Sequence, residues 1–136
     1  MTKPLACKDY FDNVDEQIEH ICQNGQVSDW ELKSLLICRS EQKVDFLLID
    51  IREMYEYTEQ SIEGADMLLP TSTIHLHMDN LEAKKDSFII LYCRTAGRTS
   101  QMLQILKRMG FSKIAHLSEG IVSYSGVTLK NAPIPN

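Results

Sequence analysis

A cysteine followed by two arginines is the strongest chemical signal in this chain of 136 residues. Cys93 directly follows the apolar run at residues 88–92, and Arg94 and Arg98 stand one and five positions after it. If the run is a buried strand and a helix begins near Arg98, Cys93 lies at the carboxyl end of that strand, where open α/β sheets bind ligands. A helix amino terminus and two guanidinium groups both favour the thiolate form of a cysteine over the thiol. The pattern therefore predicts that Cys93 is a nucleophile.

Charge is unevenly distributed along the chain. Residues 1–66 carry 15 acidic and 6 basic side chains, a net charge of −9, whereas residues 67–136 carry 4 acidic and 8 basic ones, a net charge of +4. No Asp or Glu stands between Ser87 and Ser118. The basic residues of that stretch are Arg94, Arg98, Lys107, Arg108 and Lys113. Chance scatter is one explanation, and a local positive field for a small anionic ligand is the other. The basic residues are too few and too poorly clustered to indicate nucleic acid as a partner.

Short apolar runs and amphipathic helices must position this cysteine. Runs without alternation of polar and apolar residues are typical of strands covered on both faces, as in a parallel sheet. They occur at residues 44–51, 88–92 and 114–117, with a weaker candidate at 67–69. Helical patterns occur at residues 53–59, at about 73–83 and at 99–109, the last of them ended by Gly110. Strands that alternate with helices predict one α/β domain.

The first part of the chain is predicted to be a helical extension. Asn13 with Glu16 and Ser28 with Glu31 have the spacing of capping boxes, and a helical apolar pattern follows each pair. Gly25 stands where the first of these helices should end. The predicted division of the chain is an extension at residues 1–27, a main domain at 28–130 and a flexible tail at 131–136. The sequence leaves open whether the extension packs on the domain, mediates a dimer or binds a partner.

The other three cysteines are predicted to play no part in the chemistry. Cys22 and Cys38 fall on or near the apolar faces of the first two predicted helices, so we expect buried, unreactive thiols. Cys7 lies in a segment that we expect to be mobile. None of the four cysteines forms a C-x-x-C pair, and no apolar stretch suits a signal peptide or is long enough to span a bilayer. These features predict a cytoplasmic protein without structural disulfides and without contact with a membrane.

Metal and cofactor chemistry have little support in the sequence. His75 and His77 are two positions apart, which points them away from each other on a helix, and no cysteine or carboxylate cluster completes a ligand set. An exposed helix face is the favoured interpretation of this pair. His20 and His116 stand alone. We therefore expect neither a metal site nor a cofactor.

Several motifs, in order along the chain, resemble those of the single-domain rhodaneses, a family of sulfurtransferases. The run Leu-Ile-Asp-Ile-Arg-Glu at residues 48–53 resembles the family's opening strand with its Asp-x-Arg signature. Ile-Glu-Gly-Ala at 62–65 resembles the Ile-Pro-Gly-Ala step, and Cys-Arg-Thr-Ala-Gly-Arg-Thr at 93–99 resembles the active-site loop. Leu-Ser-Glu-Gly-Ile at 117–121 resembles the closing strand and turn. The resemblance extends from about residue 28 to residue 129.

This resemblance implies a rhodanese-like three-layer α/β domain, with a central parallel sheet and helices on both faces. It implies that the Cys93 thiolate takes sulfane sulfur from a small anionic donor (thiosulfate, a persulfide or a polysulfide) and passes it to cyanide, a thiol or a protein cysteine. The residues that follow the cysteine are then the substrate-binding loop: Arg94, Thr95, Ala96, Gly97, Arg98 and Thr99. Asp50 and Arg52 end another strand and are expected to support the loop as an ion pair rather than to touch the substrate.

Three other functions are alternatives to this one. A carrier module would relay a persulfide between proteins with little turnover of small molecules, and a regulatory domain would not be catalytic, although Cys93 and both arginines are present. A cysteine phosphatase is less favoured, because Cys93 and Arg98 are spaced as Cys-x4-Arg, one residue short of the Cys-x5-Arg loop that cradles a phosphate. The sequence does not fix the oligomeric state.

Overall fold

Five parallel strands form the central sheet of the computed structural model, which describes residues 5–135. Their order across the sheet is β1-β6-β5-β2-β4. Their bounds are β1 Gln26–Val27, β2 Leu47–Asp50, β4 Met67–Leu68, β5 Ile89–Tyr92 and β6 Ile114–Leu117. The three longest strands lie next to one another and are covered on both faces, which explains why their sequences are apolar without alternation. The predicted parallel sheet is therefore confirmed.

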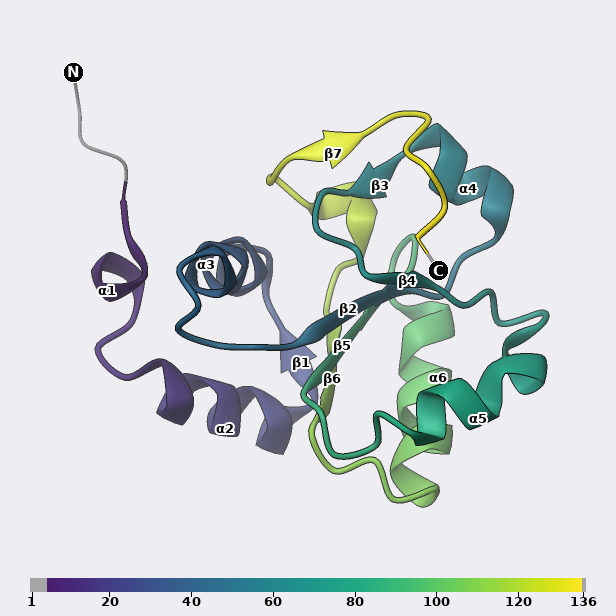
Figure 1. Ribbon diagram of the computed structural model, residues 1–136, viewed down its shortest axis with the longest axis horizontal. Coiled ribbons are helices and arrows are strands. Elements are labelled where there is room, and N and C mark those ends of the chain that lie inside the picture. The colour runs from purple at the N-terminus through teal and green to yellow at the C-terminus, as the bar shows by residue number, and fades with distance from the viewer. Residues whose placement is uncertain (1–4, 136) are drawn as a thin grey trace.

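Helices cover both faces of this sheet (Figure 1). One face is covered by α1 (Cys7–Tyr10), α2 (Val14–Asn24) and α3 (Asp29–Ser40), and the other by α5 (Met78–Glu82) and α6 (Gly97–Arg108). Successive residues of a strand serve opposite faces, as Leu48 and Ile49 of β2 do, because side chains alternate along a strand. The predicted three-layer α/β architecture is confirmed.

Smaller elements lie beside the central layers. α4 (Met54–Glu59) follows β2, and β3 (Ser61–Ile62) pairs with β7 (Thr128–Leu129) in a separate antiparallel sheet. Two short 3-10 helices are η1 (Ile74–His77) and η2 (Ile121–Ser123). The helix predicted at about 73–83 is divided between η1 and α5, because His77, with φ −119° and ψ 14°, departs from the α-helical conformation.

The predicted ends of the first two long helices agree with the structure. Asn13 Oδ1 accepts the N–H of Glu16 at the start of α2, and Gly25 ends this helix in the left-handed region, at φ 72°. Ser28 and Glu31 form a complete capping box at the start of α3, in which each side chain accepts the other residue's backbone N–H. Side-chain acceptors here satisfy N–H groups that a helix start otherwise leaves unpaired.

The amino-terminal segment packs onto the domain and corrects two predictions about cysteines. Cys7 is buried and forms a disulfide with Cys38 of α3, so it does not lie in a mobile tail and Cys38 is not a free thiol. The expectation of no structural disulfide is wrong for the same reason. The two cysteines are separated by 31 positions, and only the packing of α1 against α3 brings their sulfurs together. Cys22 is a half-buried free thiol whose pKa is raised by burial.

Residues 26–27 also join the main sheet, because β1 pairs in parallel with β6. They belong to the stretch that the sequence assigned to an extension, and the division at 27/28 and 130/131 stays a prediction. Within residues 5–135, no helix combines the length and the apolar character that crossing a bilayer requires.

Candidate active site

Cys93 lies directly after β5, at the carboxyl end of the sheet, and its residue surface is 1% exposed. Its side chain belongs to the apolar cluster that packs against α6, together with Leu91 and Met102. The loop of residues 94–96 then leads into α6, which begins at Gly97. The sequence predicted a helix starting one or two residues later, so the position of Cys93 between a strand and a helix amino terminus is as expected.

Backbone N–H groups gather around the turn that follows this cysteine. Within the described chain, none of the N–H groups of residues 94–99 donates to another group of the protein, and the first such donor in α6 is Ser100, which bonds to Ala96. Unpaired N–H groups at a helix amino terminus attract negative charge, and α6 is 12 residues long. The turn can therefore bind an anion that forms on, or reacts with, the sulfur of Cys93.

A second segment, residues 120–122, packs against this turn and holds it in place. Ile121 N–H donates to the carbonyl oxygen of Cys93 at 2.9 Å, and Val122 N–H donates to that of Arg94 at 3.2 Å. Gly120, at φ 73°, lies so close that a Cβ there would overlap the carbonyl oxygens of Arg94 and Thr95. The left-handed backbone and the close approach both require glycine at position 120. These contacts turn the loop carbonyls toward η2 and leave the N–H groups unpaired.

Asp50 and Arg52 form a buried ion pair at the end of β2. Arg52 Nη2 lies 2.8 Å from Asp50 Oδ2, and its Nε donates to the same carboxylate. Arg52 also donates to the carbonyl oxygen of Gln60 at 2.6 Å and lies over the ring of Tyr92, which precedes Cys93. The pair therefore joins β2 to the end of α4 and to β5.

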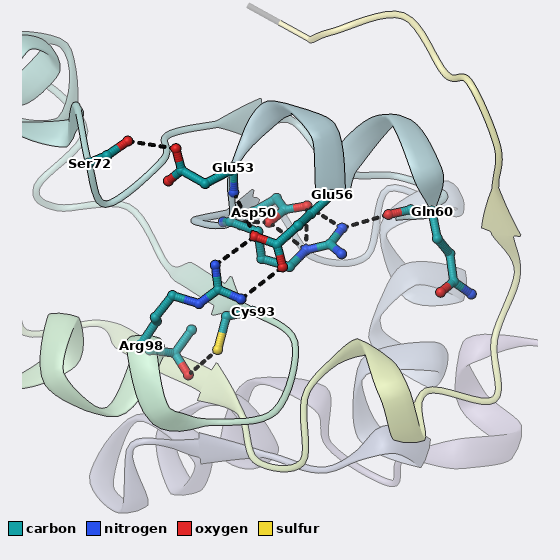
Figure 2. A network of polar contacts seen from close by, with 9 residues as sticks. Asp50, Glu53, Glu56, Gln60, Ser72, Cys93 and Arg98 are labelled. Carbon is teal, nitrogen blue, oxygen red and sulfur yellow. Dashed lines mark hydrogen bonds and ion pairs between the residues drawn. The ribbon is translucent and has the colours of Figure 1, made fainter.

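Arg98 of the loop contacts a residue that the sequence did not single out. It donates to both carboxylate oxygens of Glu56, at 2.7 and 2.9 Å (Figure 2). The Arg98 guanidinium holds the pKa of Glu56 at about 2, well below its usual range, and Glu56 in turn raises the pKa of Arg98. Glu56 also accepts the N–H of Glu53 at the start of α4. The charge of Arg98 is thus compensated within the protein.

A cavity of about 330 Å³ lies beside the loop. Its lining combines side chains of both charges with two apolar ones: Arg52, Glu56, Glu59, Gln60, Arg94, Ile121, Val122 and Lys130. Arg94 and Lys130 make no ion pair within the described residues, so they offer positive charge to a ligand. The cavity is therefore a place where an anionic group can lie next to the turn.

His116 is a residue of the site that the sequence reasoning missed. Thr99 Oγ1 lies 3.6 Å from Cys93 Sγ and 2.8 Å from His116 Nδ1, so the three side chains form a continuous chain of polar contacts. His116 is 5% exposed, and burial, together with the nearby charge of Lys107, lowers its pKa. The one available signal was a polar side chain in the otherwise apolar run at residues 114–117.

The structure brings the predicted site residues together in two groups. Cys93 and the loop of residues 94–99 lie at the end of β5, and Asp50 with Arg52 lies at the end of β2, the neighbouring strand. His75 and His77 are exposed on η1, away from any cluster. Among residues 5–135, no group of three His, Cys, Asp or Glu side chains is arranged to hold a metal ion.

Comparison with known proteins identifies relatives over most of the chain. The family model of the rhodanese-like domain matches residues 28–126. MoeZ of Mycobacterium tuberculosis, named a probable adenylyltransferase/sulfurtransferase, is 36% identical over 78 residues, which make up 57% of this chain and 20% of MoeZ. The tRNA uridine(34) hydroxylase of Escherichia coli is 32% identical over 85 residues, 60% of this chain and 24% of that protein. The chain thus spans about a fifth to a quarter of these curated relatives.

A solved structure supports the fold independently. The thiosulfate sulfurtransferase of Pseudomonas aeruginosa superposes with a TM-score of 0.67 at 19% identity, covering 89% of this chain and 23% of that one. At this identity the similarity concerns the fold alone, and it agrees with the order of layers and strands described above.

Proposed function

The chain belongs to the rhodanese-like domain family, and from this premise we propose that it transfers sulfane sulfur through a persulfide on Cys93. The observation that carries the proposal is the position of Cys93 beneath a turn whose N–H groups, at residues 94–99, have no acceptor in the described chain. The name of MoeZ, which includes sulfurtransferase, adds support at the level of the family.

The reaction divides into two transfers on the same sulfur. The Cys93 thiolate attacks the sulfane sulfur of the donor, a new S–S bond forms, and the bond to the leaving group breaks, with its electron pair leaving as sulfite or as a thiolate. An acceptor then attacks the outer sulfur of the Cys93 persulfide and regenerates the thiolate. Covalent catalysis of this kind replaces one difficult transfer with two easier ones.

The turn and its arginines have separate roles in this proposal. The N–H groups of residues 94–99 stabilise the negative charge on the persulfide and on the departing group, as an oxyanion hole does. Arg94, which has no ion-pair partner in the described chain, orients an anionic donor from the cavity beside the loop. Arg98 and the Asp50–Arg52 pair act by holding the loop against α4 and β2.

The proposed donors are thiosulfate, a persulfide or a polysulfide, and the proposed acceptors are cyanide, a thiol or a protein cysteine. We propose a cytoplasmic location, and we propose no role for nucleic acid, membranes or a cofactor. A phosphatase is disfavoured, because the spacing of Cys93 and Arg98 is one residue shorter than a phosphate-binding loop needs.

A carrier module is the second candidate function. In MoeZ the matched region makes up only 20% of the protein, and the name of MoeZ includes a second activity, adenylyltransferase. A domain of this kind that works beside another activity favours the carrier function. In that arrangement the persulfide on Cys93 would pass to a partner protein, and turnover with small acceptors would be slow.

Mass spectrometry of the full chain after incubation with thiosulfate tests the proposal. We expect a gain of one sulfur atom on Cys93 that dithiothreitol reverses, and its loss in Cys93→Ser, while Cys22→Ser keeps the gain. No adduct with thiosulfate, polysulfide or glutathione persulfide would contradict sulfur transfer in either form. An adduct that forms without thiocyanate production from cyanide favours the carrier over the enzyme.

A further inference from the structure

A buried chain of polar side chains runs from the reactive sulfur to the sheet. Cys93 Sγ lies 3.6 Å from Thr99 Oγ1, and Thr99 Oγ1 lies 2.8 Å from His116 Nδ1. The carbonyl oxygen of Ala96, 3.2 Å from Thr99 Oγ1, is a further acceptor for the Thr99 hydroxyl. Cys93 directly follows β5, Thr99 lies in the first turn of α6, and His116 is the third residue of β6. All three are buried, so the contacts are shielded from competing water. The proposed function uses Cys93, but it assigns no task to His116.

An anionic sulfur fixes the direction of these hydrogen bonds, whereas a thiol leaves the Thr99 hydroxyl two acceptors. A threonine hydroxyl donates one proton and can accept others, and a neutral imidazole has one donor and one acceptor nitrogen. When Cys93 is a thiol, its S–H can donate to Thr99 Oγ1, and the Thr99 hydroxyl then donates either to the carbonyl oxygen of Ala96 or to an unprotonated Nδ1 of His116. When Cys93 carries a thiolate or a persulfide anion, the Thr99 hydroxyl must donate to sulfur, and Nδ1–H of His116 must donate to Thr99.

The surroundings of His116 allow both arrangements. Burial, reinforced by Lys107, lowers the pKa of His116, so the ring is neutral near neutral pH and its single N–H can lie on either nitrogen. Nε2 makes no hydrogen bond within the described residues and is not among their fully buried unpaired atoms, so it keeps contact with solvent. In the arrangement where Thr99 donates to Nδ1, ionisation of the thiol passes its proton to Thr99, the Thr99 proton passes to Nδ1, and Nε2 releases a proton to water. The exchange balances without a charged imidazole at its end.

We infer that His116 is a positioning residue of the sulfur-transfer site, which acts through Thr99: His116 Nδ1–H donates to Thr99 Oγ1, and the Thr99 hydroxyl is thereby directed to Cys93 when the sulfur is anionic. The inference rests on the proposed role of Cys93. Charged groups near the sulfur are Arg94 and Arg98 of the loop, Glu56 of α4, which pairs with Arg98, and Asp50 at the end of β2, and Lys107 of α6 faces His116. None of these groups changes in the variants used below.

Alkylation of Cys93 by iodoacetamide as a function of pH tests this inference in the full chain carrying Cys22→Ser, which removes the other free thiol. The leucine of His116→Leu cannot form a hydrogen bond with Thr99, so the hydrogen bond that stabilises the charged sulfur is weakened. We expect this variant to be alkylated about tenfold more slowly near neutral pH, and the midpoint of its alkylation rate against pH to move upward. His116→Asn places an amide where Nδ1 lies, and we expect it to keep most of the parent rate. His116→Gln places its amide near Nε2 instead and should behave as His116→Leu does, which gives a second, polar test if the leucine variant does not fold.

A double-variant comparison separates this role from a structural one. Thr99→Val removes the hydroxyl that links the two residues, so His116→Leu should slow alkylation no further in a Thr99→Val background. Three results would each overturn the inference. They are equal alkylation rates for His116→Asn and His116→Leu, additive effects of Thr99→Val and His116→Leu, and a pH profile of His116→Leu that is the same as that of the parent. Alkylation requires no sulfur donor. If no persulfide forms on Cys93, the proposed function is contradicted, but the effect of His116 on the alkylation rate of Cys93 is still measured.

Discussion

Arg98 of α6 donates two hydrogen bonds to Glu56 of α4, at 2.7 and 2.9 Å, in an ion pair beside Cys93 (Figure 2). The pair fastens the first turn of α6 to the helix that follows β2. It also compensates the charge of Arg98, and within the described residues Arg94 is the loop arginine without an ion-pair partner. The proposed attraction of an anionic donor and the support of the loop therefore involve different arginines.

Substitution of Arg94 should affect donor binding more than the chemical step. Its side chain is exposed at the cavity beside the loop, and the charge contributes about 1 kcal/mol or less at such a position. We expect Arg94→Gln to raise KM for thiosulfate by about three- to fivefold with little change in kcat, as steady-state kinetics will measure. Arg108→Gln, at the exposed end of α6, is the matched control. An unchanged KM in Arg94→Gln would exclude this role.

The Glu56–Arg98 pair should make stability depend on pH in the acidic range. The pKa of Glu56 is about 2 in the folded protein against an ordinary value of 4.5, so the carboxylate stabilises the fold above the unfolded value. This contribution is lost as the pH falls toward 2. Glu56→Gln should lower the free energy of unfolding near neutral pH by about 1–3 kcal/mol. The difference in the free energy of unfolding between Glu56→Gln and the parent should become smaller in acid.

Urea unfolding at a series of pH values measures this difference. Glu59→Gln is the control, because Glu59 is exposed on the same helix and forms no ion pair within the described chain. If the difference in the free energy of unfolding between Glu56→Gln and the parent stays constant down to the lowest pH, the ion pair is not the source of that difference.

Two glycines of the site should respond in opposite ways to alanine. Gly120 has φ 73° and lies against the carbonyl oxygens of Arg94 and Thr95, so Gly120→Ala must displace the loop. We expect a loss of several kcal/mol in the free energy of unfolding, on the order of other strained substitutions. At Gly97 a Cβ meets no atom within 4 Å, so Gly97→Ala should leave stability unchanged or raise it by about 0.5–1 kcal/mol. Thermal unfolding compares the two, and equal losses would contradict the argument.

The parts of the site that could be predicted from the sequence are those set by neighbours along the chain. The apolar run before Cys93 and the amphipathic pattern after it are local, and they correctly predicted that Cys93 lies between a strand, β5, and a helix, α6. The same holds for the capping box of Ser28 and Glu31. Short-range patterns were sufficient because strand burial and helix capping depend on residues a few positions apart.

The contacts that escaped prediction join residues far apart in sequence. Glu56 and Arg98 are separated by 42 positions, and Thr99 and His116 by 17. Each pair meets only because of the order of strands in the sheet and the packing of α4 and α6 at its carboxyl edge. Contacts of this kind leave no pattern in the local sequence, so the single histidine in the apolar run at residues 114–117 gave no indication that it contacts Thr99.

The disulfide between Cys7 and Cys38 should stabilise the fold against denaturant. It closes a loop of 31 residues, for which the chain-entropy model gives about 3–4 kcal/mol, and it holds α1 against α3. We therefore expect dithiothreitol to lower the urea midpoint of the parent and to have no effect on Cys7→Ser, which should unfold at the midpoint of the reduced parent. Cys22→Ser is the control, since it leaves the disulfide intact and should keep the full response to reductant. If the parent unfolds at the same urea concentration with and without dithiothreitol, the pair contributes nothing to stability, and α1 is held by packing alone.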